Sequence, residues 1–96
     1  MKTENILTLL AFNGVKTSKV VANETGSVIL ISIEKGKELA AHKSNTDASI
    51  LILEGEVLFK IKGEEYPLKV HDMFSFNKAE THAIEAVSDA KLILIK

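Results

Sequence analysis

From residue 15 onward, short apolar runs alternate with polar turns that often contain glycine. Within residues 57–62, Val57, Phe59 and Ile61 alternate with a more polar set, which predicts a strand with one buried and one mostly solvated face. Turn residues recur about every 8–12 positions, a rhythm typical of an all-β sandwich or barrel. We therefore predict an all-β fold with strands at Lys16–Ala22, Ser27–Glu34, Glu38–Ser44, Ala48–Glu54, Val57–Lys62, Glu65–Val70, Met73–Phe76, Thr81–Val87 and Ala90–Lys96.

The N-terminal residues follow a different pattern, which predicts one short helix at about residues 3–12. Thr3 can cap its first turn, and Ile6, Leu9 and Leu10 then share one face. We interpret that face as a packing surface for the strands that follow.

Three of the predicted strands are apolar almost without interruption, at residues 28–31, 50–53 and 92–95. Strands of this kind need cover on both faces. The cover can come from a second sheet, from the N-terminal helix or from another subunit. Because the chain is so small, we expect a partner chain to supply part of it and predict a homodimer.

Length and composition limit the classes of function. With 96 residues we expect one domain, residues 1–96, made of the helix and a barrel at about residues 15–96. The net charge is −1 and all 12 basic residues are lysines, so nucleic acid is a poor partner. The absence of cysteine excludes disulfides and thiol nucleophiles. No apolar run approaches the ~18 residues of a membrane span, and we expect a soluble, cytoplasmic protein.

Two of the three histidines are candidates for a shared site. His42 shares its predicted strand face with Ala40 and Ser44, and His82 stands beside the small residue Ala83. One histidine on an apolar face is more often a core residue, but two in separate strands, each beside small residues, favour a common cavity. His71, next to Asp72, is interpreted as a solvated turn residue because histidine tolerates left-handed backbone.

These residues resemble the motifs of the cupin family. Gly36, five intervening residues, His42 and later Gly55 are similar to the first cupin motif, and the segment from His71 to His82 is similar to the second. The resemblance covers nearly the whole chain. It implies a double-stranded β-helix, that is, a double-sheet jelly roll closed into a small barrel.

The same resemblance implies four metal ligands, of which this chain keeps only His42 and His82. The second histidine of the first motif falls on Ser44, and its glutamate falls on Ala48. A catalytic zinc usually keeps three protein ligands, and non-haem iron keeps two histidines and a carboxylate. We therefore expect no cofactor, or a weakly bound divalent metal ion.

Two functions remain open. The first, which we favour, is a small-molecule-binding barrel without chemistry of its own, whose ligand contacts His42, Ser44, Ala48 and His82. The second is a metal-dependent enzyme of the oxygenase or isomerase type, in which His42 and His82 hold the metal. The lack of arginine counts against phosphorylated sugars as substrates.

Overall fold

The computed structural model describes the backbone of residues 5–43, 46–78 and 80–96, and the side chains of the same residues except 41–43. Most of these residues are in strands, so the all-β prediction is confirmed, and each strand lies within two residues of its predicted bounds. The strands are β1 (Val15–Asn23), β2 (Gly26–Ile33), β3 (Glu38–Lys43), β4 (Ala48–Glu54), β5 (Val57–Ile61), β6 (Glu64–Leu68), β7 (Met73–Phe76), β8 (Thr81–Ala86) and β9 (Ala90–Ile95).

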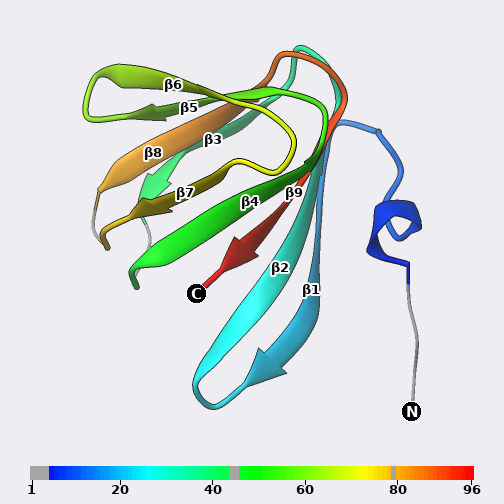
Figure 1. Ribbon diagram of the computed structural model, residues 1–96, viewed down its shortest axis with the longest axis vertical. Coiled ribbons are helices and arrows are strands. Elements are labelled where there is room, and N and C mark those ends of the chain that lie inside the picture. Colours follow the sequence, from blue (N-terminus) through cyan, green and yellow to red (C-terminus); the bar gives the residue numbers. More distant parts are fainter. Residues whose placement is uncertain (1–4, 44–45, 79) are drawn as a thin grey trace.

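The strands form two antiparallel sheets that face each other (Figure 1). One sheet has five strands in the order β1-β2-β9-β4-β7, and the other has four in the order β3-β8-β5-β6. Because the chain passes repeatedly from one sheet to the other, neighbours within a sheet are mostly not consecutive in sequence. This is the predicted jelly-roll barrel.

The core lies between the inner faces of the two sheets. On β5, Val57, Phe59 and Ile61 are buried while Leu58 and Lys60 are partly exposed, as the alternation predicts. Phe59 is among the largest fully buried side chains. The buried core comprises Ile31, Ile33, Ala48, Ile50, Ile52, Val57, Phe59, Ile61, Phe76, Ile84, Ala86, Ala90 and Leu92.

The N-terminal segment covers part of the outer face of the five-stranded sheet. The hydroxyl of Ser32 on β2 donates to the carbonyl of Ala11 at 3.0 Å, and the ammonium of Lys91 on β9 donates to the carbonyl of Leu7. The same ammonium lies 4.5 Å from the ring centroid of Phe12. The apolar strands were expected to need cover on both faces, and this segment covers part of their outer face.

The predicted helix at residues 3–12 is much too long. Among the described residues there is a single 3-10 helix, η1 (Ile6–Thr8), whose cap Asn5 accepts a hydrogen bond from the N–H of Leu7. The predicted cap, Thr3, lies outside the described residues. None of the residues of η1 is buried, and a short helix without a packed face is marginal in water. The chain beyond it bends and contacts the sheet through Ala11 and Phe12.

The two ends of the barrel differ. At one end the turn before β5 meets the turn before β9: the N–H of Glu56 donates to the hydroxyl of Ser88 at 3.0 Å, and the N–H of Val87 donates to the carbonyl of Glu56 at 2.9 Å. At the opposite end β3, β5 and β7 finish and β4, β6 and β8 begin. We call this second end the mouth. Within the described residues, no helix has the length and apolar character required to span a bilayer.

Candidate functional site at the mouth of the barrel

His82, the second residue of β8, is a packed side chain at the mouth and is 3% exposed. Its ring is stacked on Phe59, with the centroids 5.6 Å apart and the planes at 14°. Phe76 approaches it at 4.4 Å in a tilted arrangement. His82 is thus held between aromatic rings that come from both sheets.

One hydrogen bond fixes which nitrogen of His82 carries the proton in the neutral ring. Nδ1 lies 3.0 Å from the carbonyl oxygen of Glu80. A carbonyl can only accept, so Nδ1 carries the hydrogen and donates it. In the neutral imidazole the lone pair is then on Nε2, the atom that can accept a hydrogen bond or bind a metal.

Glu80 also ties its loop to the β5–β6 hairpin. Its Oε1 lies 2.9 Å from Nζ of Lys62, which follows β5. The hydrogen bond to Glu80, together with the charge of that carboxylate, raises the pKa of Lys62. The backbone of Glu80 therefore orients His82 while its side chain neutralises the cation at the mouth.

The structure describes the other predicted site residues only in part. In the pairing of β3 with β8, the backbone of His42 lies opposite that of His82, whereas the side chain of His42 and all of Ser44 lie outside the described residues. Ala48 is 6% exposed and packs in the core, where it pairs with Phe76 on β7. Phe76 thus neighbours Ala48 through strand pairing and His82 through its ring.

A β-bulge sets this register. Leu39 pairs with Ile84 and His42 pairs with His82, so β3 carries one residue more than β8 over this stretch. The expected grouping of Ala40 with the cavity residues is wrong: Ala40 is exposed, and Leu39 packs against the core. Simple alternation could not show this because a bulge moves every later residue to the other face.

Four aromatic rings form a continuous series leading out from His82, and sequence reasoning missed most of it. Phe59 lies 5.1 Å from Phe76 and 4.8 Å from Phe74, and Phe74 lies 5.0 Å from Tyr66. The pattern of β7 indicated only that Phe74 and Phe76 share a face. Nothing in the sequence connects Tyr66 on β6 with them, because β6 and β7 belong to different sheets.

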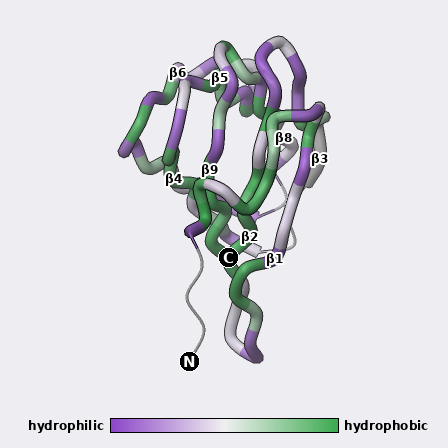
Figure 2. The backbone as a smooth tube through the Cα atoms, turned by 90° about the vertical axis from the view of Figure 1, so that its right-hand side faces the viewer, coloured by the Kyte–Doolittle hydropathy of each residue, from purple (hydrophilic) through white to green (hydrophobic). Residues whose placement is uncertain are grey.

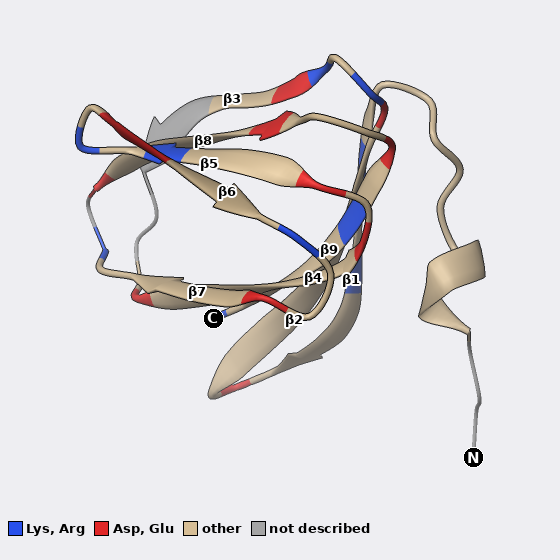
Figure 3. Ribbon diagram, turned by 45° about the horizontal axis from the view of Figure 1, so that its top comes forward, with Lys and Arg blue, Asp and Glu red and all other residues tan. Residues whose placement is uncertain are grey.

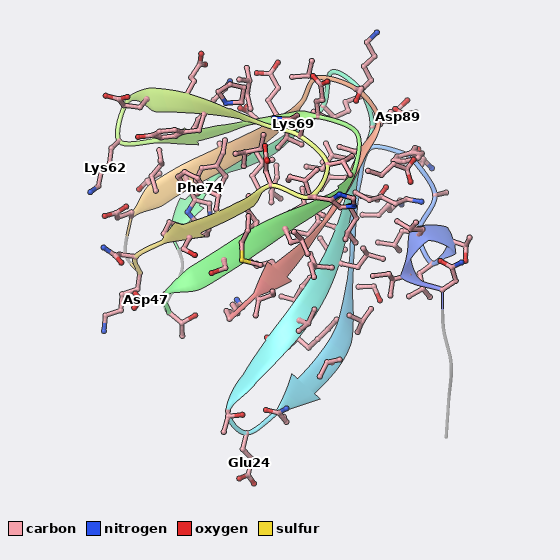
Figure 4. All side chains as sticks on the ribbon, viewed as in Figure 1. Glu24, Asp47, Lys62, Lys69, Phe74 and Asp89 are labelled. Atoms are coloured by element: carbon pink, nitrogen blue, oxygen red, sulfur yellow. The ribbon has the colours of Figure 1, made fainter. Side chains whose placement is uncertain are left out.

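A pocket of about 220 Å³ opens where this aromatic series reaches the surface. Figure 4 shows Phe74 between the two sheets and Lys62 at the end of the β5–β6 hairpin, on the same side of the molecule as Asp47. We call this the mouth pocket. It is lined by Ile61, Lys62, Tyr66, Phe74, Ser75, Phe76, Asn77 and Glu80.

A second pocket, of about 350 Å³, shares Ile61 and Lys62 with the mouth pocket but lies along residues 60–65 and 81–83. Its lining includes Glu64 and Glu65, which are exposed. A ligand there would have to displace water from these carboxylates, which is unfavourable. We take the mouth pocket as the candidate for a ring-shaped ligand because Tyr66, Phe74 and Phe76 line it, although Lys62 and Glu80 line it as well and His82 lines the second pocket.

The described residues do not fit a resident metal ion. No group of three or more histidine, cysteine, aspartate or glutamate side chains lies close enough together among them to hold one. Asp47, which adjoins the position of the missing glutamate, accepts a hydrogen bond from the N–H of Lys78 at 2.8 Å. In the described part of the site, Nε2 of His82 offers one metal ligand. A catalytic metal ion usually needs three protein ligands.

His71 takes no part in this site. It is exposed, lies in the turn between β6 and β7, and has a φ of 75°, in the left-handed region. Its prediction as a solvated turn residue is confirmed.

The family follows from a match that covers most of the chain. Residues 29–96 match the model of the cupin domain. The chain belongs to the cupin family. A comparison with curated protein sequences gives no match.

Solved structures of other proteins are similar over most or nearly all of the chain. An RmlC-like cupin from Desulfovibrio desulfuricans is 25% identical, with a TM-score of 0.88 over 99% of this chain and 94% of its own. A protein of unknown function from Streptococcus pyogenes is 22% identical, with a TM-score of 0.86 over 98% and 84%. A predicted oxalate decarboxylase from Thermotoga maritima is 22% identical, with a TM-score of 0.75 over 84% and 77%. At 22% identity, the similarity to the last two structures concerns the fold alone.

Proposed function

We propose that this cupin is a binding protein that takes a small, uncharged molecule with a single ring in its mouth pocket and performs no chemistry on it. The observation that carries the proposal is the lining of that pocket. Tyr66, Phe74 and Phe76 supply aromatic faces and edges, and the cation of Lys62 is already paired with Glu80. His82 does not line this pocket and supports it through Phe76, whose ring lies 4.4 Å from the imidazole. The ligand contacts expected at His42, Ser44 and Ala48 stay predictions.

Size and charge support this class of ligand. The pocket of about 220 Å³ is smaller than the roughly 300–1,000 Å³ typical of drug-sized ligands, so it suits about one ring. Aromatic faces favour offset or edge-on contacts with another ring. An anionic ligand would have to compete with Glu80 for Lys62, and the sequence contains no arginine to replace it.

Titration with 4-methylphenol, followed by amide chemical shifts, tests the proposal, with benzoate as the charged analogue and cyclohexanol as the non-aromatic one. We expect 4-methylphenol to shift the amides of the mouth pocket and to bind more tightly than either analogue. Tyr66→Ala should weaken this binding at least about fivefold, or about 1 kcal/mol. Val87→Ala, which removes an exposed apolar side chain away from the pocket, should leave it unchanged. If 4-methylphenol fails to bind at millimolar concentration, or binds equally well to Tyr66→Ala, the proposal is wrong.

The second candidate, a metal-dependent enzyme, is favoured by the register that sets His42 opposite His82. Its test is elemental analysis of protein purified without a tag, repeated on His42→Ala and His82→Ala. Stoichiometric metal that is lost in both variants would favour the enzyme. Metal absent from the parent protein would favour the binding protein. The cytoplasmic location of this protein stays a prediction.

A further inference from the structure

Polar groups are concentrated around the mouth pocket rather than along the strands of the sheets. Strand β9, for example, is hydrophobic over most of its length (Figure 2). Charged residues gather at the tip of the β5–β6 hairpin and in the connections before β4 and β8, while β7 carries none (Figure 3). The rim of the mouth pocket is therefore where a polar group on a ligand can be recognised.

Most of the polar side chains that line the mouth pocket already have a partner. Nζ of Lys62 lies 2.9 Å from Oε1 of Glu80. The hydroxyl of Ser75 shares a hydrogen bond of 2.7 Å with the hydroxyl of Ser49 on β4. A ligand that used one of these groups would first have to break the existing pair, and it would lose about as much free energy as it gained.

Two neutral polar groups of the lining remain, the side-chain amide of Asn77 and the hydroxyl of Tyr66. Among residues 5–43, 46–78 and 80–96, neither group has a hydrogen-bond partner. An amide carries its donor and its acceptor on separate atoms, so Asn77 can either accept a hydrogen bond from a ligand or donate one to it.

The turn that carries Asn77 is held to both sheets. Directly after Asn77, the N–H of Lys78 donates to Oδ1 of Asp47, which precedes β4, at 2.8 Å. Further along the same turn, Glu80 binds Lys62 at the end of β5. Because these contacts fix the backbone beside Asn77, little conformational freedom is lost when its amide binds a ligand.

Tyr66 is less suited to this role. Its ring packs on Phe74, with the centroids 5.0 Å apart, and belongs to the aromatic surface of the pocket. The hydrogen and the lone pairs of a phenol lie near the plane of its ring, and a hydrogen bond weakens steeply when it is bent. A ligand packed on the face of Tyr66 is therefore poorly placed to use its hydroxyl.

We propose that Asn77 determines the specificity of the mouth pocket for a ring that carries one neutral hydrogen-bonding substituent, such as a phenol or an aromatic amide. The inference rests on the proposed function and narrows its class of ligand. A ring without a polar substituent gains nothing from Asn77, which is exposed and stays in contact with water. A phenol packs on the aromatic surface and also hydrogen-bonds to the amide.

The binding of 4-methylphenol and of toluene, which lacks only the hydroxyl, tests the proposal. Amide chemical shifts give both dissociation constants, and the ratio of the toluene constant to the 4-methylphenol constant measures the contribution of the hydroxyl. Asn77→Leu, which keeps the approximate size of the side chain, should lower this ratio at least about threefold. Asn77→Ala should lower it in the same way, and it keeps the test valid if circular dichroism shows that Asn77→Leu is not folded.

Two further variants serve as controls. Lys78→Ala removes the exposed side chain next to Asn77 and keeps the backbone N–H that binds Asp47. Tyr66→Phe removes the other neutral hydroxyl and keeps the aromatic ring. Both variants should leave the ratio of the two constants unchanged.

The outcomes separate this inference from the proposed function. If 4-methylphenol binds but the ratio is the same in the parent and in both Asn77 variants, the inference is wrong and the proposed function stands. A ratio that falls in Tyr66→Phe but not in Asn77→Leu assigns the contact to the tyrosine and also overturns the inference. If neither compound binds the parent protein, the proposed function fails and this inference fails with it.

Discussion

At the scale of single residues, His82 is determined by its packing as much as by its chemistry. Phe59 and Phe76 enclose its ring, and the carbonyl of Glu80 fixes its tautomer. The sequence marked this histidine as a candidate because small residues surround it in the chain. The enclosing rings come from β5 and β7, so no local pattern could have identified them.

His82→Ala should lower the free energy of unfolding by about 2–3 kcal/mol, because it leaves a cavity between packed rings and removes a hydrogen bond. Urea unfolding measures the loss. Thr81→Ala, at the exposed neighbour in the same strand, should cost less than about 1 kcal/mol. Equal effects of the two substitutions would show that the ring is not packed as described.

At the scale of elements, alternation, short apolar runs and the turn residues between them predicted each of the nine strands, because these signals act locally along the chain. Local signals failed for the N-terminal helix and at Ala40 of β3. The helix needs a packed face that η1 does not have. In β3 the bulge inserts one residue between Leu39 and His42. Both outcomes depend on neighbouring elements that the local sequence does not encode.

Three strands of the four-stranded sheet share an ion cluster whose effect on stability depends on pH. The hydrogen bonds that Lys60 donates to Glu85 and then to Glu38 raise the pKa of Lys60 from 10.5 to about 12. The charged lysine is favoured in the folded state, so its stabilising contribution is fully present below pH 10.5. The contribution is lost as the pH rises through about 12.

The stability difference between the parent and Lys60→Met should therefore stay constant from neutral pH to about 10.5 and shrink above it. Urea unfolding as a function of pH measures this difference, and methionine keeps most of the apolar stem. In a Glu85→Gln background the decline should be smaller and should end at lower pH, because the first partner of Lys60 in the folded state is missing. A stability difference that grows with pH would contradict the raised pKa of Lys60.

At the scale of the whole molecule, the two sheets are joined tightly at one end and leave the mouth at the other. Gly55 shows how tight the joined end is. Its φ is 76°, and an added Cβ would overlap the carbonyl oxygen of Asp89 in the turn between β8 and β9. The backbones of two turns, each connecting one sheet with the other, therefore meet at a position that only glycine fits.

Gly55→Ala should destabilise the protein by about 2–4 kcal/mol, since it combines left-handed strain with the displacement of a backbone carbonyl. The matched control is Gly63→Ala, where φ is 73° but an added Cβ meets nothing within 4 Å. We expect that control to cost about 1 kcal/mol. Thermal unfolding of the two variants measures how much stability each one loses. Similar losses would show that the two turns can move apart without destabilising the protein.

The sequence alone determined the all-β class, the position of each strand and the family resemblance, because alternation and turn residues act locally along the chain. It also identified His82 as a candidate site residue. The tertiary structure decided which strands became neighbours and therefore which rings enclose His82 and line the mouth pocket. It likewise brought Lys62, Asn77 and Glu80 to the lining of one pocket. Register between strands far apart in sequence is set by packing across the whole barrel, so no single segment contains it.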